Sequence, residues 1–222
     1  MYKIVNKRQL GSQIYLMDIE APRVAKSANP GQFVIVKMDE KGERIPLTIC
    51  DYDRDLGTVT IVFQTLGEST KKMAQYEEGE FFSDFVGPLG MPSEFVKEDI
   101  DELRKKNILF IAGGVGTAPV YPQVKWMFNN DIKVDVIIGT RTKDTLILGD
   151  EMKAVAGELY IATDDGSYGY KGMVTNLLKD LVEKEGKKYD LVVAIGPMIM
   201  MKFVCQLTKE LNIPTVVSLN PI

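Results

Sequence analysis

The chain has 222 residues, a formal net charge of −4 and no histidine. The acidic balance argues against a nucleic-acid-binding protein, which would present a basic face. The lack of histidine excludes every mechanism that needs an imidazole base or ligand. The two cysteines, Cys50 and Cys205, cannot hold a zinc ion or an iron–sulfur cluster alone. If the chain is an enzyme, we expect a bound organic cofactor to carry the chemistry.

The sequence contains no signal for a membrane or for export. No apolar run is long enough to cross a bilayer. The first residues, MYKIVNKRQL, alternate polar and apolar side chains and lack the apolar centre of a signal peptide. We therefore expect a cytoplasmic protein that neither inserts into membranes nor binds nucleic acid.

The N-terminal part of the chain has a hydrophobic pattern of period two, which predicts short strands. The pattern predicts strands at Lys3–Leu10, Gln13–Glu20, Gln32–Met38, Ile45–Asp51, Thr58–Thr65 and Phe81–Val86. One helical pattern interrupts them at Ser69–Tyr76, with Ser69 as its N-cap. About six short strands in fewer than about 100 residues predict an antiparallel barrel or sandwich.

The period changes after Glu94. Lys97–Lys106 is charged and predicts a surface connection or a short helix. Beyond it the pattern predicts strands at Ile108–Ala112, Val134–Gly139, Leu159–Thr163, Leu191–Ile195 and Thr215–Leu219, and helices at Val120–Asn129, Asp150–Val155, Met173–Glu185 and Met198–Leu211. Apolar strands that alternate with helices predict a doubly wound parallel sheet covered on both faces. We place the domain boundary so that residues 1–96 and 97–222 form separate domains.

A glycine-rich turn stands out in the segment Asn107–Pro122, NILFIAGGVGTAPVYP. A buried strand runs into this turn, and a helix opens near Pro119. Backbone N–H groups at such a helix start can bind a phosphate, and glycine lets the anion approach closely. The turn is not a G-x-G-x-x-G motif, because Pro119 replaces the third glycine. Taken alone, it is equally compatible with a phosphate cradle and with a plain strand-to-helix turn.

Three further loops follow strands of the same predicted sheet. They are Ala162–Gly172, the segment Ile195–Met198, and the pair Thr140 and Arg141. Taken alone, each segment is most often an ordinary polar loop or a short turn between a strand and a helix. Ligands of parallel sheets bind outside the carboxyl ends of the strands, where all of these loops converge. Together they favour a nucleotide site.

The barrel has its own candidate segments. Arg44–Thr48 places Pro46 inside a strand pattern, which suggests an edge or a bulge, and puts Leu47 and Thr48 on opposite faces. Phe63–Thr70 runs from a strand into a helix start, a second possible anion site. From the residues alone, an ordinary barrel edge and helix cap are the favoured interpretation of both segments.

Considered together, these segments resemble the ferredoxin–NADP reductase superfamily, with an FAD-binding Greek-key barrel ahead of a pyridine-nucleotide domain. The chain is most similar to small flavin subunits of the NADH-dependent ferredoxin:NADP oxidoreductase type. Electron-transfer subunits of dihydroorotate dehydrogenase and sulfide dehydrogenase subunits are close relatives. The similarity rests on RIPLTICD, VFQTLGEST, DFVGPLG, GGVGTAPVYP, TDDGSYGYKG and IGPMIMMK, and covers nearly the whole chain.

The resemblance implies a role for each matching segment. Thr48 would hydrogen-bond flavin N5 and is the implied catalytic residue. The implied FAD-binding residues are Arg44, Pro46, Leu47, Thr48, Val62, Phe63, Gln64, Gly67, Ser69 and Thr70. The implied NAD(P)-binding residues are Gly113, Gly114, Val115, Gly116, Thr117, Ala118, Pro119, Thr140, Arg141, Asp164, Asp165, Gly166, Ser167, Gly196, Pro197 and Met198. No metal ligand is implied within residues 1–222.

The sequence departs from the family pattern in two places. The family's flavin motif has an arginine three residues before the Ser or Thr, where this chain has Ile45 and carries Arg44 one step earlier. In a strand this shift turns the side chain to the other face, so that Arg44 reaches a pyrophosphate only if a bulge at Pro46 restores it. The relatives' four-cysteine [2Fe–2S] segment would follow Ser218–Ile222, so we expect a cluster only if that segment is missing here.

The resemblance implies hydride transfer between NAD(P)H, with NADH favoured, and FAD, followed by single-electron transfer to an iron–sulfur partner. That partner would be ferredoxin or a larger redox subunit in a heteromeric complex. Three alternatives remain: an electron-transfer subunit of dihydroorotate dehydrogenase, a flavin-free nucleotide-binding or docking module, and a subunit that only conducts electrons within a complex.

Overall fold

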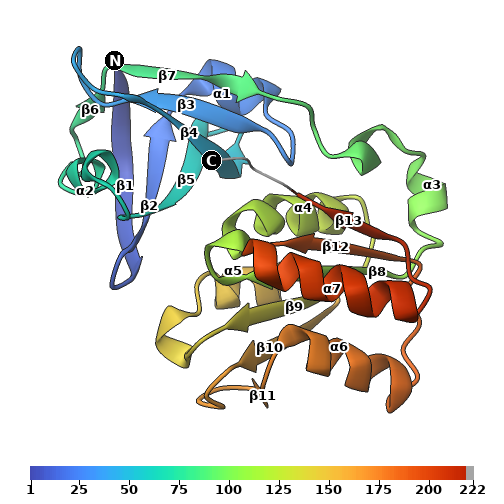
Figure 1. Ribbon diagram of the computed structural model, residues 1–222. Coiled ribbons are helices and arrows are strands. Elements are labelled where there is room, and N and C mark those ends of the chain that lie inside the picture. The colour runs from blue at the N-terminus through green and yellow to red at the C-terminus, as the bar shows by residue number, and fades with distance from the viewer. Residues whose placement is uncertain (219–222) are drawn as a thin grey trace. The chain divides into compact units, whose positions relative to one another are not determined.

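The computed structural model describes residues 1–218. The expected last strand, Thr215–Leu219, therefore ends beyond the described residues, and most of Ser218–Ile222 lies outside them. The chain divides into two compact units, Met1–Val96 and Lys97–Ile222. Each unit has its own sheet and its own helices (Figure 1).

The first unit is an antiparallel, nearly closed barrel. Its elements are β1 (Tyr2–Gly11), β2 (Ile14–Glu20), α1 (Pro22–Ser27), β3 (Phe33–Lys37), β4 (Arg44–Asp53), β5 (Thr58–Gln64), α2 (Glu68–Met73), β6 (Phe81–Phe82), β7 (Asp84–Leu89) and the 3₁₀ helix η1 (Glu94–Lys97). The strand order is β6-β1-β2-β5-β4-β3-β7. Strands β3, β4 and β5 form a meander that returns beside β2, which is a Greek-key connection.

The barrel closes at a break between β6 and β7. The sequence pattern predicted one strand, Phe81–Val86, ended by the glycines and proline of residues 87–90, and this prediction is wrong. Residues Phe81 and Phe82 pair with β1, whereas β7 pairs with β3 and continues to Leu89. Between them, Ser83 donates from its backbone N–H to Met38 and from its hydroxyl to Lys37. One segment thus bridges the two edges of the sheet.

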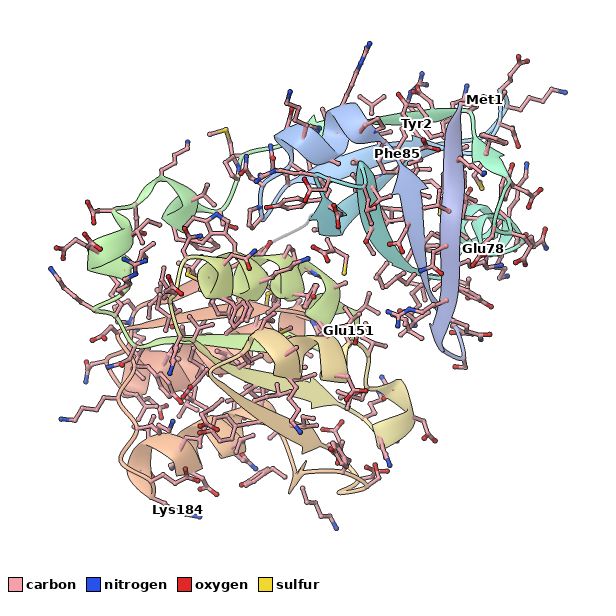
Figure 2. All side chains as sticks on the ribbon, turned by 180° about the vertical axis from the view of Figure 1, so that it is seen from behind. Met1, Tyr2, Glu78, Phe85, Glu151 and Lys184 are labelled. Atoms are coloured by element: carbon pink, nitrogen blue, oxygen red, sulfur yellow. The ribbon has the colours of Figure 1, made fainter. Side chains whose placement is uncertain are left out.

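Aromatic side chains fill the barrel at the same seam. The rings of Tyr2 on β1 and Phe85 on β7, both labelled in Figure 2, have centroids 5.7 Å apart. Phe82 and Phe85 are fully buried. Alternation of side chains directs one face of each strand inward, so the core is formed by residues two apart along every strand. The short helix α1 packs Val24 and Ala25 into this core, although the sequence pattern did not predict a helix there.

The second unit is a parallel sheet with helices on both faces. Its elements are α3 (Ile100–Leu103), β8 (Ile108–Gly113), the 3₁₀ helix η2 (Gly114–Gly116), α4 (Thr117–Asn129), β9 (Asp135–Thr140), the 3₁₀ helix η3 (Lys143–Thr145), α5 (Gly149–Val155), β10 (Glu158–Thr163), β11 (Tyr170–Lys171), α6 (Val174–Glu183), β12 (Leu191–Ile195), α7 (Met198–Glu210) and β13 (Thr215–Val217). Helices α4 and α5 pack together on one face, and α6 and α7 on the other (Figure 1).

The strand order β11-β10-β9-β8-β12-β13 reverses direction at β8. From β8 the chain winds outward through β9 and β10, and then returns to β12 on the other side of β8. Strand β8 has every residue buried, as expected for a strand covered on both faces. Two details differ from the sequence pattern. Helix α4 starts at Thr117 rather than near Pro119, and the loop after β10 contains the short strand β11.

A half-buried ion pair lies at the amino end of this sheet. Asp135 accepts hydrogen bonds from the Tyr189 hydroxyl at 2.9 Å and from Lys187 Nζ at 3.0 Å. The bond to Asp135 raises the pKa of Lys187 from 10.5 to about 12, and burial raises the pKa of Tyr189 above its ordinary value. Because the pKa of Lys187 is raised on folding, this pair stabilises the fold at neutral pH, and the contribution is lost as the pH rises through about 12.

We expect Asp135→Ala to lower the free energy of unfolding of the second unit by about 2 kcal/mol, because it leaves the buried Tyr189 hydroxyl without an acceptor. Asp180 provides a matched control: it also accepts from a tyrosine and a lysine, Tyr170 at 3.0 Å and Lys184 at 2.9 Å, but near solvent. Urea denaturation should therefore show a smaller loss for Asp180→Ala. Equal losses for the two variants would contradict this account.

Candidate functional site

The candidate nucleotide site lies at the carboxyl edge of the parallel sheet. Strands β8, β9, β10 and β12 end there at Gly113, Thr140, Thr163 and Ile195, and the pairing registers keep these ends level. The order of strands reverses between β8 and β12, which is where open parallel sheets bind ligands. The sheet thus brings together all four loops that the sequence pattern singled out.

Glycine makes a close backbone contact possible at this reversal point. A Cβ on Gly116 would lie 2.4 Å from the carbonyl oxygen of Ile195, and one on Gly196 would lie 2.9 Å from Gly113 Cα. A Cβ on Gly113 would lie 2.5 Å from Met200 Sδ. The loops after β8 and β12 therefore pack backbone against backbone, and no larger residue fits at these three glycines.

Met200 fills the remaining gap between the two loops. Its Sδ faces Gly113 and its methyl group faces Gly196, on the first turn of α7. The sequence reasoning did not include Met200 among the site residues. Its contact with Gly113 joins segments far apart in the chain, and no local pattern in the sequence pointed to it.

Gly114 differs from its neighbours. It has a φ of +54°, and a Cβ placed on it would meet nothing within 4 Å. It opens η2, which leads into α4, and the Thr117 hydroxyl donates to its carbonyl oxygen at 2.8 Å. No side chain caps the start of the 13-residue helix α4. Its first-turn N–H groups and partial positive charge thus lie beside an open glycine, an arrangement that suits a phosphate.

The loops after β9 and β10 are tied to each other. The backbone N–H of Asp164 donates to Thr140 at 3.1 Å, and that of Lys143 donates to the Ser167 hydroxyl at 2.8 Å. Ser167 in turn donates to Asp165 at 2.7 Å, and this bond holds the pKa of Asp165 below its ordinary value. Asp165 is therefore a fixed carboxylate in this loop pair. Arg141, Asp164 and Asp165 are all exposed.

The candidate flavin surface lies on β4 of the barrel. Strand β4 pairs with β3 in an unbroken register from Arg44 opposite Lys37 to Thr48 opposite Phe33. Ile45 and Leu47 pack against the barrel core, whereas Arg44 and Pro46 are exposed. Alternation places Arg44, Pro46 and Thr48 together on the outer face.

The pairing of β4 with β3 shows which face of the strand carries Arg44. The unbroken pairing contains no bulge at Pro46; the irregularity of β4 lies between Ile49 and Asp51, where it faces β5. Arg44 and Thr48 therefore share a face, and Arg44 points to the face opposite to that of Ile45, as its one-step shift predicts. Ile45, which occupies the family's arginine position, packs against the core. Leu47 also packs against the core, so only its backbone is available at the outer face.

Strand β5 and helix α2 carry the other expected flavin residues. Val62 and Phe63 are buried, whereas Gln64 is half-exposed. Phe63 stacks on Tyr15, with ring centroids 5.9 Å apart. A Cβ on Gly67 would meet nothing within 4 Å, so the chain leaves open space at this helix start.

The two hydroxyls of the first turn of α2 have different partners. The Thr70 hydroxyl accepts from the backbone N–H groups of Leu66 and Gly67, each at 3.1 Å, and donates to the Gly67 carbonyl oxygen. The Ser69 hydroxyl donates to the Glu43 carboxylate. The sequence reasoning did not consider Glu43, and no motif in the sequence pointed to it.

Two kinds of site find no support within residues 1–218. The described side chains form no group of three or more histidine, cysteine or acidic residues able to hold a metal ion. No helix in that part of the chain is long and apolar enough to span a membrane.

The chain is similar to several known proteins. The profile of the oxidoreductase NAD-binding domain matches residues 110–206. An uncharacterized protein of Clostridium beijerinckii, named only for its place in the adh 3′ region, is 65% identical over the whole chain, which covers 75% of that protein. A Thermotoga maritima homologue of the dihydroorotate dehydrogenase B (NAD(+)) electron transfer subunit is 40% identical over 99% of the chain, which covers 74% of the homologue.

The chain is also similar to proteins of known structure. The chain superposes on the structure of an NADH-dependent reduced ferredoxin-NADP oxidoreductase with a TM-score of 0.89 and 39% identity, covering the whole chain and 77% of that protein. An Amycolatopsis cytochrome P450 reductase has a TM-score of 0.76 at 16% identity, covering 97% of the chain and 68% of that protein, and shares the fold alone.

The barrel, the parallel sheet and the NAD-binding profile define an oxidoreductase with a nucleotide domain. The chain belongs to the ferredoxin–NADP reductase superfamily, among the electron-transfer subunits of the dihydroorotate dehydrogenase B type and their homologues.

The glycines of the β8 loop should respond unequally to alanine. We expect Gly116→Ala to lower the free energy of unfolding by about 3 kcal/mol, because its Cβ has no space beside Ile195. Gly114→Ala should cost only about 1 kcal/mol, the strain of a left-handed alanine. Urea denaturation of both variants measures the difference, and a Gly116→Ala protein as stable as wild type would contradict the close contact.

Proposed function

We propose that this chain is a flavoprotein electron-transfer subunit that accepts hydride equivalents from NADH through FAD and passes single electrons to an iron–sulfur partner. The observation that carries the proposal is the pairing, within one chain, of a nucleotide edge at the reversal point of a parallel sheet with a flavin surface on a Greek-key barrel. The 40% identity to a homologue of an electron transfer subunit whose name includes NAD(+) supports a nicotinamide nucleotide as one redox partner.

The residues of the barrel suit FAD. When bound, FAD accepts two electrons as a hydride and can release them one at a time. The flat face of Pro46 and the hydroxyl of Thr48 would bind the isoalloxazine, with Arg44 on the same face available to the pyrophosphate. The open space at Gly67 leaves room for a phosphate at the backbone. Thr48 would donate a hydrogen bond to flavin N5 and so position the ring.

The residues of the parallel sheet suit a dinucleotide. Gly114 and the start of α4 would bind the pyrophosphate, while Gly196, Pro197 and the exposed Met198 would lie by the nicotinamide. Thr140, Arg141 and the loop at Asp165 would meet the adenosine half. The fixed Asp165 carboxylate would accept from a ribose hydroxyl and repel a 2′-phosphate, which favours NADH over NADPH.

The electron acceptor belongs to the same proposal. The solved relative acts with ferredoxin by its name, and the Thermotoga maritima relative is named as an electron transfer subunit homologue. We propose that the partner is ferredoxin or a larger redox subunit with flavin or iron–sulfur centres. A [2Fe–2S] cluster of the chain's own would need a cysteine segment outside residues 1–222.

Flavin binding and the choice of nucleotide test this function directly. The purified protein, reconstituted with FAD, should show flavin absorbance that bleaches on titration with NADH and much less with NADPH under anaerobic conditions. Reduction of an artificial dye by the isolated chain should then depend on NADH. A protein that remains colourless after reconstitution would instead indicate a flavin-free nucleotide-binding module.

The Thr48 hydroxyl should matter for rate rather than for cofactor retention. We expect Thr48→Ala to keep FAD but to slow flavin reduction by NADH about tenfold, the value of one hydrogen bond of about 1.4 kcal/mol. Thr48→Ser, which keeps the hydroxyl, is the matched control and should retain most of the rate. Stopped-flow traces of flavin bleaching measure all three proteins, and an unchanged rate in Thr48→Ala would remove the N5 role.

A further inference from the structure

The Glu43 carboxylate accepts a hydrogen bond from Ser69, one of the residues expected to bind the FAD pyrophosphate. Glu43 lies directly before β4, and Ser69 lies in the first turn of α2, 26 residues later. An acid therefore occupies a hydroxyl that the family resemblance assigns to the FAD pyrophosphate. A carboxylate and a phosphate are both anionic oxygen acceptors, and they would compete for the same donor.

The contact matters because Ser69 is the adaptable donor of this turn. A hydroxyl has one proton to donate, and Ser69 directs it to Glu43. The Thr70 hydroxyl is engaged with the backbone of its own loop: its proton goes to Gly67, and it accepts from Leu66 and Gly67. A phosphate that needs a side-chain hydroxyl here must take Ser69 from Glu43.

The two lysines of α2 pair with carboxylates other than that of Glu43. Lys71 pairs with Glu68 at 2.9 Å, and Lys72 pairs with Asp39 at 2.5 Å. Among residues 1–218, Glu43 and Arg44 form no ion pair. The negative charge of Glu43 therefore acts on an incoming anion without local neutralisation, while Arg44 remains free to attract that anion.

We infer that Glu43 sets how tightly this chain holds FAD, by occupying Ser69 in place of the pyrophosphate and repelling the incoming charge. FAD binding requires the Glu43 carboxylate to leave Ser69, so part of the cofactor's binding free energy is spent on that displacement. This inference rests on the proposed flavin function of the barrel.

A plain structural role for the contact predicts something different. If Glu43 only fastens α2 to the start of β4, its removal lowers stability and leaves FAD affinity unchanged or weaker. If it competes with the pyrophosphate, its removal strengthens FAD binding. Affinity and stability therefore separate the two roles, and neither readout depends on the catalytic rate.

The test is a titration of the apoprotein with FAD, followed by flavin fluorescence, for wild type, Glu43→Gln and Glu43→Ala. Both variants should lower the FAD dissociation constant about tenfold, the effect of removing one unit charge near a diphosphate at a partly solvated site. Glu68→Gln is the matched control, since it removes a carboxylate from the same turn that is already paired with Lys71, and it should change the affinity less.

A second probe isolates the pyrophosphate. ADP carries the diphosphate without the flavin ring, and the same gain in its affinity for Glu43→Gln is expected by calorimetry. Unchanged or weaker FAD binding in both Glu43 variants would overturn the inference while leaving the flavin function intact. If neither wild type nor the variants bind FAD, the proposed function fails and the inference fails with it.

Discussion

The contact between two glycine loops is the constraint on which the nucleotide domain depends. Gly116 lies against Ile195, and Gly196 lies against Gly113, at distances that a Cβ would not permit. The contact brings the ends of β8 and β12 together where the sheet reverses, and it sets where α4 and α7 begin. Both helix starts then face the same carboxyl edge. A ligand bound there would meet backbone N–H groups and helix termini rather than acid–base side chains, which agrees with a chain that has no histidine.

In the barrel, a single strand, β4, arranges the candidate flavin-binding residues. Because β4 keeps an unbroken register with β3, its side chains divide between core and outer face, and Arg44, Pro46 and Thr48 come to lie in one row. Closure of the barrel by the β6–β7 segment keeps β3 and β4 inside the sheet, which fixes that row in place. Rigid strands of this kind hold a flat ring better than loops do.

The sequence pattern predicted the fold class and the carboxyl edge well, because long-range periodicity reports burial. It missed features that depend on contacts between distant segments. The break at Ser83 follows from hydrogen bonds to Lys37 and Met38, which no local pattern encodes. Met200 and Glu43 were missed for the same reason: each contacts residues far away in the chain. The one-step shift of the arginine predicts that Arg44 faces away from Ile45, and alternation along the unbroken pairing of β4 with β3 gives that result.

The third glycine of the dinucleotide motif is absent here, and other glycines provide the close packing that it allows in the motif. In that motif one glycine makes the tight turn, one lets the phosphate approach, and the third lets helix and strand pack closely. Here Gly114 has the positive φ and the open space, so it would serve both the turn and the approach of a phosphate. Close packing is supplied by Gly116 against Ile195 and by Gly113 against Gly196. Position 119 is then free to be proline, since the first turn of α4 needs no N–H there. The motif is therefore better recognised by these separate physical tasks than by the spacing of its letters.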